Sequence, residues 1–170
     1  MLNLKYPVPE GFLNEETRRD YTISETMKKA WAVQMDLFQE LMRVCKEHNL
    51  RVFADSGTLI GAVREKGFIP WDDDIDVAML REDYDKLLEL SAEFKDPYYL
   101  QTISTHPYYI NRYAQLHMKG TTAIRTDGKP QRHQQNIFID IFVIDTLPSN
   151  PRALKRHYVK VRKANQKLKL

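Results

Sequence analysis

The sequence has a single cysteine, no long apolar run and no acidic residue after Asp145. Cys45 has no partner for an internal disulfide, and its apolar surroundings favour a small buried residue over a reactive thiol. No segment approaches the roughly 20 apolar residues that a membrane-spanning helix needs. Pro7 interrupts the N-terminus, which has no apolar segment typical of a signal peptide. These absences predict a soluble, cytoplasmic protein, at most peripheral at the inner face of a membrane.

Because it lacks acidic residues, the end of the chain is strongly basic. Eight of the 26 Lys and Arg residues follow Asp145, so the rest of the chain, with all 23 Asp and Glu residues, carries about −5. The positive formal net charge therefore belongs to the tail, which argues against a nucleic-acid-binding protein. This basic helix either packs on further protein or is attracted to an anionic lipid or glycan at a membrane. The histidines lack zinc-ligand spacing with a cysteine.

The length of 170 residues predicts one domain. Residues 1–23 contain prolines and a glycine and are expected to be irregular. Apolar residues at helical spacing predict a helix over 24–48, with Ser24 as its cap. Other patterns predict strands at 51–54, 74–79, 98–103, 110–118 and 137–144, helices at 59–64 and 81–94, and a pairing of 121–124 back onto 110–118. Residues 24–148 then form an α+β domain, a mixed sheet with helices mainly on one face, followed by a basic helix over 149–170.

An acidic cluster, Asp72-Asp73-Asp74-Ile75-Asp76, is the strongest local feature. In an extended chain Asp72, Asp74 and Asp76 point to one side and alternate with apolar residues beyond Asp74. Carboxylates two residues apart lie roughly 6.5–7 Å apart at the backbone and can converge on a small cation. Mg²⁺ prefers such oxygen ligands together with water and substrate phosphates. The alternative is a solvated acidic loop that leads into the helix at Arg81.

A further acid, Asp140, lies in the most apolar segment, which is expected to be a central strand buried on both faces. A buried carboxylate is costly unless it is paired or bound to a metal. We therefore expect Asp140 to be a third metal ligand or a base, or else one half of a buried salt bridge. Asp145 follows the strand and is expected to be a turn residue.

The turn Ser56-Gly57-Thr58 follows a strand and precedes a helix. Glycine allows backbone N–H groups to approach a ligand, and the N-terminus of a helix favours anions. The turn, with Arg64 and Lys66 after it, therefore suggests a phosphate site beside the acidic cluster. Such corners are common in unrelated folds, and both basic residues have an alternative as simple surface charges.

Two segments resemble the LicD family of phosphocholine transferases, which is related to fukutin. The first runs from Asp55 to Val77, DSGTLIGAVREKGFIPWDDDIDV, and the second from Phe138 to Asp145, FIDIFVID. The family usually has Gly-Gly where this chain has Ser56-Gly57, and its members usually continue well beyond the second segment. The chain is therefore expected to be either a truncated or a minimal member.

The resemblance implies a polymerase-β-like nucleotidyltransferase fold and a set of site residues. Mg²⁺ or Mn²⁺ would be held by Asp74, Asp76 and Asp140, and donor phosphates would lie at Ser56, Gly57 and Thr58. Arg64 and Lys66 would steady those phosphates. The implied reaction moves a phospho-alcohol, phosphocholine from CDP-choline, to a hydroxyl of a cell-surface glycan such as lipopolysaccharide or teichoic acid, and releases CMP. The alternatives are transfer of the nucleotidyl group itself and a nucleotide-binding module without turnover.

Overall fold

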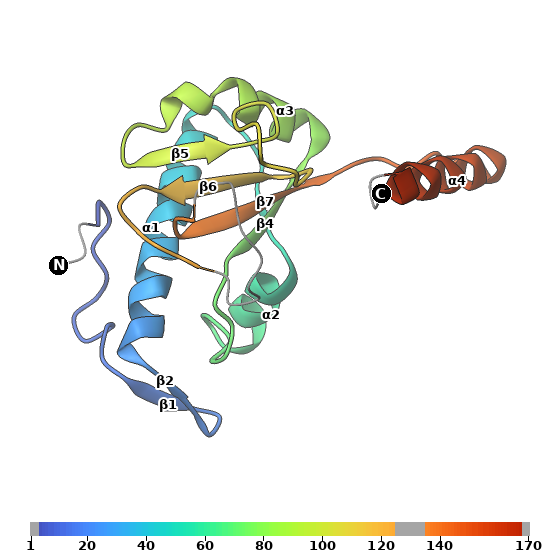
Figure 1. Ribbon diagram of the computed structural model, residues 1–170. Helices are drawn as coiled ribbons and strands as arrows, with labels where there is room; N and C mark the ends of the chain where they lie inside the picture. The colour runs from blue at the N-terminus through green and yellow to red at the C-terminus, as the bar shows by residue number, and fades with distance from the viewer. Residues whose placement is uncertain (1–3, 125–134, 168–170) are drawn as a thin grey trace.

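The computed structural model describes residues 4–124 and 135–167 and is built on a mixed sheet (Figure 1). Its strand order is β3-β4-β7-β6-β5. The strands are β3 Phe53–Ala54, β4 Asp76–Leu80, β5 Tyr98–Gln101, β6 Ala114–Met118 and β7 Phe138–Ile144. The central strand β7 runs parallel to β4 and antiparallel to β6. The prediction of an α+β fold with a mixed sheet is therefore confirmed.

Four α-helices and one 3₁₀ helix occur in the described residues. They are α1 Glu25–Glu47, α2 Ser56–Arg64, α3 Arg81–Glu89, η1 Ser91–Glu93 and α4 Pro151–Lys167. The single predicted helix over 81–94 is therefore two shorter elements. Three strands, β3, β5 and β6, are also shorter than the strands predicted at 51–54, 98–103 and 110–118. Residues 121–124 form no strand, and Ala123 N donates instead to Gln135 O at 2.7 Å. Among these residues, no helix is both long enough and apolar enough to span a membrane.

Helix α1 forms where the apolar spacing and the terminal residues predict it. Ser24 Oγ accepts a hydrogen bond from Met27 N at 3.3 Å, which caps the first turn. At the other end Asn49 has φ +54°, a left-handed conformation, and Leu50 N donates back to Cys45 O at 2.8 Å. This pattern satisfies carbonyls that a helix end leaves free. Cys45 is buried, and burial raises the pKa of its thiol to about 11, as expected for a structural cysteine.

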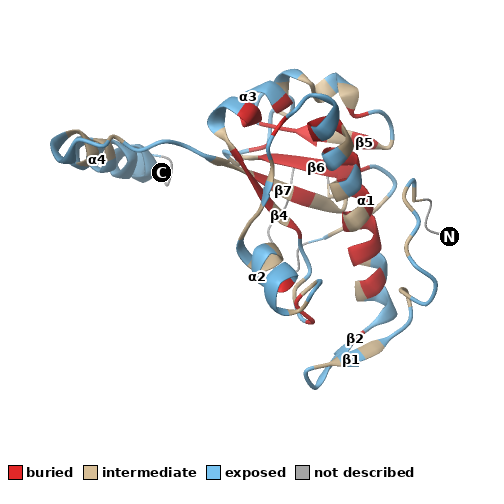
Figure 2. Ribbon diagram, turned by 180° about the vertical axis from the view of Figure 1, so that it is seen from behind, coloured by how far each residue is buried: buried red, intermediate tan, exposed pale blue. Residues whose placement is uncertain are grey.

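The hydrophobic core lies on one face of the sheet, which we call the core face. Side chains of α1 and α3 pack there against alternate residues of the central strands. Figure 2 colours the buried residues of these elements red. The fully buried residues of the central strands β4, β7 and β6 on this face are Val77, Met79, Ile139, Ile141, Ala114 and Leu116. The prediction that helices pack mainly on one face agrees with this arrangement, because α1 and α3 share one core with these residues.

Strand β7 is central but is not buried on both faces. Ile139 and Ile141 are buried, whereas Phe138, Asp140 and Phe142, which alternate with them along the strand, are only half-buried. The expectation of a doubly buried strand was wrong because the core of α1 and α3 covers only the face of Ile139 and Ile141, and the apolar Phe138 and Phe142 lie on the other face. This second face of β7 is the one that carries Asp140.

The N-terminal segment is not irregular throughout. Strands β1 Glu16–Arg18 and β2 Tyr21–Ile23 form a hairpin, with Arg19 and Asp20 at φ +52° and +58° in its turn. Two positive φ values are typical of the two-residue hairpin turn that matches strand twist. Further upstream Tyr6 N donates to Asp36 Oδ1 at 2.7 Å, which ties the segment to α1. The strands escaped prediction because each has three residues and the turn lacks glycine.

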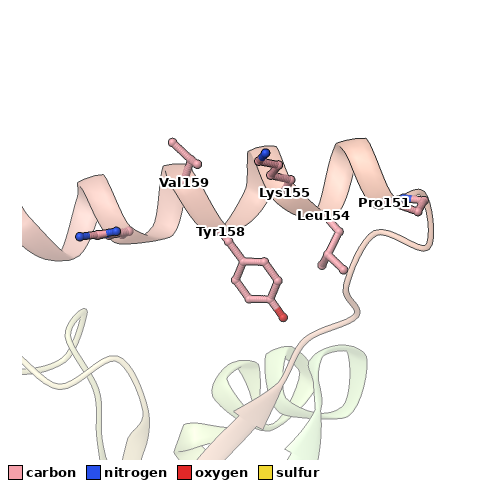
Figure 3. Close-up of a pocket in the computed structure, with 6 residues that line it drawn as sticks. Pro151, Leu154, Lys155, Tyr158 and Val159 are labelled. Atoms are coloured by element: carbon pink, nitrogen blue, oxygen red, sulfur yellow. The ribbon is translucent and has the colours of Figure 1, made fainter.

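Helix α4 projects away from the sheet (Figures 1 and 2). All its residues are exposed or half-buried, and its cations face no acid on the helix itself. A shallow hollow of about 380 Å³ lies along Leu154 and Tyr158, whose side chains point to the same side of the helix (Figure 3). The hollow is formed by α4 residues alone and is separate from the acidic cluster.

Candidate active site

The acidic segment before β4 is held in place by helix α1. Trp31 Nε1 donates to the Asp72 carbonyl at 2.8 Å, and Gln34 Nε2 donates to the Asp73 carbonyl at 2.7 Å. Both donors are buried side chains. A loop that carries several like charges resists ordering, and buried hydrogen bonds to its backbone fix its path without neutralising the carboxylates. The acids are therefore presented by a fixed backbone.

Asp76 and Asp140 lie opposite one another on neighbouring parallel strands. Their Cα atoms are register partners, and Asp140 N donates to Ile75 O at 3.0 Å. Gln115 is the register partner of Asp140 on β6, and Gln101 that of Gln115 on β5. These four side chains form what we call the polar row, on the face of the sheet opposite the core face. The predicted pair Asp76 and Asp140 is thus brought together by sheet register.

The carboxyl groups carry more negative charge than their surroundings compensate. Burial raises the pKa of Asp76 to about 7, and the charges of Asp74 and Asp140 add to this rise. Burial also raises the pKa of Asp140 to about 6, although a hydrogen bond from Gln115 acts in the opposite direction. The pKa of Asp74 is raised by burial and by Asp72 and Asp73. A bound cation would remove this penalty, because it stabilises the ionised forms.

The donor set fits a hard divalent cation. Carboxylate oxygens of Asp72, Asp73 and Asp74 lie within 4.8 Å of one another, which is close enough to share one ion. The sequence predicts a different set, Asp74, Asp76 and Asp140, of which Asp74 belongs to both. The charge of Asp74 raises the pKa of both Asp76 and Asp140, and the charge of Asp140 also raises that of Asp76. The assignment of ligands stays a prediction.

Helix α2 begins earlier than expected, at Ser56, so Ser56-Gly57-Thr58 is its first turn and not a separate turn before it. Ser56 has φ +45°, a left-handed conformation that favours glycine, which matches the position where the LicD pattern has one. At Gly57 a methyl group would overlap the Asp72 carboxylate. Gly57 therefore lets Asp72 lie against the N-terminus of α2, where negative charge is favoured.

Thr58 links α2 to the acidic strand. Its Oγ1 accepts a hydrogen bond from Asp76 N at 2.8 Å, and Asp55 N donates to Asp76 O at 3.0 Å. The backbone of Asp76 is thereby fixed on both sides. Thr58 was predicted to face the donor phosphates; the structure gives it this positioning contact next to the predicted phosphate site.

The two basic residues after the turn lie apart from its first residues. Arg64 is in the last turn of the nine-residue helix α2, roughly 12 Å along the axis from Ser56. Its Nε donates to Glu65 Oε1 at 2.6 Å. Lys66 Nζ donates to the Val63 carbonyl at 3.0 Å. The structure thus places Arg64 at the opposite end of α2 from the predicted phosphate site, whereas Lys66 lines the cavity described next.

A cavity of about 430 Å³ adjoins the acidic segment. One wall is formed by Gly57, Thr58, Asp72 and Asp74, and another by Trp31 and Phe38 of α1. The N-terminal segment closes a third side through Phe12, Glu16 and Arg18. Lys28 also lines it; its Nζ is paired with Glu16 and lies 4.9 Å from the Phe12 ring centroid. The cavity is mostly apolar with several charged groups in its lining, as ligand sites commonly are.

A family model described as LicD/FKTN/FKRP, nucleotidyltransferase domain, matches residues 49–166, more than half of the chain. The chain belongs to the LicD family. The LicD lipopolysaccharide cholinephosphotransferase of Haemophilus influenzae is 31% identical over 131 residues, which cover 76% of this chain and 48% of that protein. Uncharacterized proteins of Rickettsia prowazekii and Rickettsia typhi are each 35% identical over 83 residues, 49% of this chain and 30% and 26% of theirs.

The chain thus spans about half or less of the length of these curated relatives. The LicD match includes Ser56, Gly57, Thr58, the acidic cluster and Asp140, but it begins at Asn49. Helix α1 and the N-terminal hairpin therefore lie outside the matched range, although Trp31 and Gln34 hold the acidic segment. In this member of the LicD family the site is supported by residues beyond the matched domain.

Sequence reasoning missed three polar residues that organise the site. Trp31 and Gln34 lie in the helix predicted over 24–48, where the sequence pattern indicates no role for them beyond helical packing, yet both donate to the acidic segment. Gln34 among the apolar residues of this helix was the available signal, because a buried amide needs a partner. Gln115, whose Nε2 donates to Asp140 Oδ1 at 2.7 Å, gave no such signal. Its role depends on strand register, which the sequence alone does not specify.

Proposed function

We propose that this LicD-family chain transfers phosphocholine from CDP-choline to a hydroxyl of a cell-surface glycan, with release of CMP. The observation that carries the proposal is the register pairing of Asp76 with Asp140 beside Asp74, three carboxyl groups whose pKa values are all raised. Such a group of acids is suited to a divalent cation and to phosphoryl chemistry. The Haemophilus relative is named as a lipopolysaccharide cholinephosphotransferase, which supports choline and lipopolysaccharide, over teichoic acid, as substrates.

In this proposal Asp74, Asp76 and Asp140 hold Mg²⁺ or Mn²⁺. When bound, the cation supplies charge stabilisation for the diphosphate and for the leaving CMP. The first turn of α2, Ser56 to Thr58, directs its N–H groups toward the donor phosphates. Lys66 adds a positive charge at the rim of the cavity. The rate enhancement comes mainly from positioning the donor and the attacking hydroxyl, with little covalent work left for the protein.

The cavity gives the organic part of the donor a place beside the phosphate site. Its lining includes Gly57 and Thr58 together with the aromatic rings of Phe12, Trp31 and Phe38. Apolar and aromatic surfaces of this kind suit a nucleoside base or a methylated ammonium group. Contact with the membrane that carries the acceptor is proposed for the basic helix α4, whose cations have no acid on the helix to pair with.

The test is a donor screen followed by product analysis. We expect CDP-choline with Mg²⁺ to raise Tm and CMP to appear when a lipopolysaccharide acceptor is added. Asp74→Ala and Asp140→Asn should lose CMP release and keep a folded circular dichroism spectrum. A nucleotidylated acceptor without free CMP would replace the proposal by nucleotidyl transfer. Binding of donor and Mg²⁺ without CMP release would instead indicate a binding module, and unfolding of Asp140→Asn a structural role for Asp140.

A further inference from the structure

A line of hydrogen bonds runs from His117 through Gln115 to Asp140, on the face of the sheet that carries the polar row. Gln115 Nε2 donates to Asp140 Oδ1 at 2.7 Å, and His117 Nε2 lies 3.2 Å from Gln115 Oε1. His117 and Gln115 are 1% and 5% exposed, so both bonds lie away from solvent. Buried polar contacts of this kind are strong and geometrically restrictive, because neither group can exchange its partner for water.

The chemistry of the three groups fixes the direction of the line. An ionised carboxylate only accepts, so the Gln115 amide must present its nitrogen to Asp140 and its oxygen to His117. His117 must then carry a proton on Nε2 in order to donate to Gln115 Oε1. The imidazole is held in this orientation between two rings, with centroids 5.0 Å away at Tyr99 and 5.2 Å away at Phe138. Each group thus determines the orientation of the next.

We propose that Gln115 is a positioning residue for Asp140 and that His117 fixes the orientation of Gln115. This inference rests on the proposed function, in which Asp140 holds a divalent cation. Gln115 bonds one carboxylate oxygen, and within the described part of the chain Asp140 Oδ2 accepts no hydrogen bond. The side chain is thereby held in one rotamer with an oxygen available for a cation. A hydrogen-bonded neighbour that orients a ligating carboxylate commonly supports cation affinity in this way.

The polar row itself supplies a matched control. Gln101 is the register partner of Gln115 on β5, points to the same face and is 1% exposed. Neither atom of its amide has a hydrogen-bond partner among the described residues. Replacing Gln101 therefore removes an equally buried amide from the same row without touching Asp140. A purely structural role for Gln115 predicts equal effects of the two replacements on cation binding.

The experiment measures Mn²⁺ affinity of the purified chain by electron paramagnetic resonance titration, with Tm recorded for each variant. Gln115→Met is expected to weaken Mn²⁺ binding by about 10–100-fold, the range typical for groups that support a metal ligand. Gln101→Met should stay within about twofold of the unmodified chain, since its side chain contacts no metal ligand. Asp140→Asn serves as the reference and should lose at least as much affinity as Gln115→Met.

Unchanged affinity in Gln115→Met, with loss in Asp140→Asn, would overturn the inference and leave the proposed function standing. Unchanged affinity in Asp140→Asn would overturn both, because Asp140 would then hold no cation. If Gln115→Met does not fold, His117→Phe decides the matter: it preserves a ring beside Tyr99 and Phe138 but removes the Nε2 donor. A loss of about 3–10-fold in His117→Phe supports the inference, and full affinity contradicts it.

Discussion

The two faces of the central sheet are built from alternate residues of the same strands, yet they differ in almost every property. On the core face Val77 and Ile141 are completely buried among apolar side chains of α1 and α3. One residue earlier on each strand, Asp76 and Asp140 face the other way and have pKa values of about 7 and 6. Neighbouring residues of one strand thus belong to different parts of the protein: one to the hydrophobic core and the next to the candidate site.

The largest expected effect concerns the acidic side of this comparison. Asp76→Asn should lower CMP release by at least about 1000-fold, because it removes a ligand charge worth several kcal/mol of transition-state stabilisation. The fold should persist, since the replacement has nearly the same volume and removes an unfavourable charge. Steady-state assays with CDP-choline and Mg²⁺ would measure the loss. Near-normal turnover would contradict the assignment of Asp76.

Asp73→Asn separates the two possible groups of cation ligands. Asp73 belongs to the close group Asp72 to Asp74 but not to the set predicted from the sequence. If the predicted set holds the cation, Asp73→Asn should retain most activity. A loss as large as that of Asp76→Asn would transfer the metal site to the close group.

A substitution on the core face should lower stability and leave cation binding unchanged. Ile141→Ala removes a fully buried side chain and should lower the free energy of unfolding by about 2–5 kcal/mol, from lost burial and the cavity left behind. Urea denaturation would measure this change. Cation affinity of the folded fraction should stay unchanged, because the side chain points away from the polar row. A change below about 1 kcal/mol would show that the core face is less tightly packed than described.

A smaller expected effect is the pH dependence of stability that Asp76 causes. The pKa of Asp76 is raised to about 7 in the folded chain, so its contribution to stability is present below about pH 4 and is lost as pH rises through 7. In metal-free buffer Asp76→Asn should therefore have a higher Tm than the unmodified chain above pH 7. Each kcal/mol of this gain corresponds to roughly 2–4 °C of Tm in a chain of this size.

The difference between the two proteins should vanish below about pH 3, where Asp76 is protonated in both the folded and the unfolded chain, and should shrink when Mg²⁺ is added at about pH 7.5. Calorimetric scans at several pH values would follow it. A Tm gap that is independent of pH would mean that Asp76 ionises as easily in the folded chain as in the unfolded one.

The smallest effect tests the start of α2. Ser56 has a positive φ, which costs a non-glycine residue about 1–2 kcal/mol. Ser56→Gly relieves this strain but adds flexibility to the unfolded chain, so a net gain of about 0.5–1 kcal/mol is expected. Denaturant titration would measure it, with Ser56→Ala as the control that keeps the strain. A loss of stability in Ser56→Gly would show that the hydroxyl contributes more than the strain costs.

The parts of the fold that depend on local pattern could be predicted from the sequence. Helix α1 combines an apolar stripe with a serine cap, and β7 has a strongly β-forming composition. The expectation that β7 is buried on both faces failed because Phe138 and Phe142 resemble core residues but occupy the face of the polar row. The first turn of α2 was missed because Ser56 and Gly57 are typical turn residues, and here they lie inside the helix.

The candidate site could be predicted only as far as its acids. Asp74, Asp76 and Asp140 stand out by their alternation and by the apolar context, whereas Gln115 comes from another strand, 25 residues from Asp140. Its contact with Asp140 follows from register, which long-range pairing determines. Arg64 could not be placed because its distance from Ser56 depends on where α2 begins.

Gly57 and Asp72 lie 15 positions apart in the sequence but share one small volume at the start of α2. Because a side chain at position 57 would force this carboxylate out of its present place, we expect the two positions to constrain each other's evolution. Homologues that keep the acid should keep the glycine, and those that replace the acid with a smaller residue should tolerate alanine or serine there. A comparison of aligned sequences would then show these positions changing as a pair, and a designer who alters one must redesign the other.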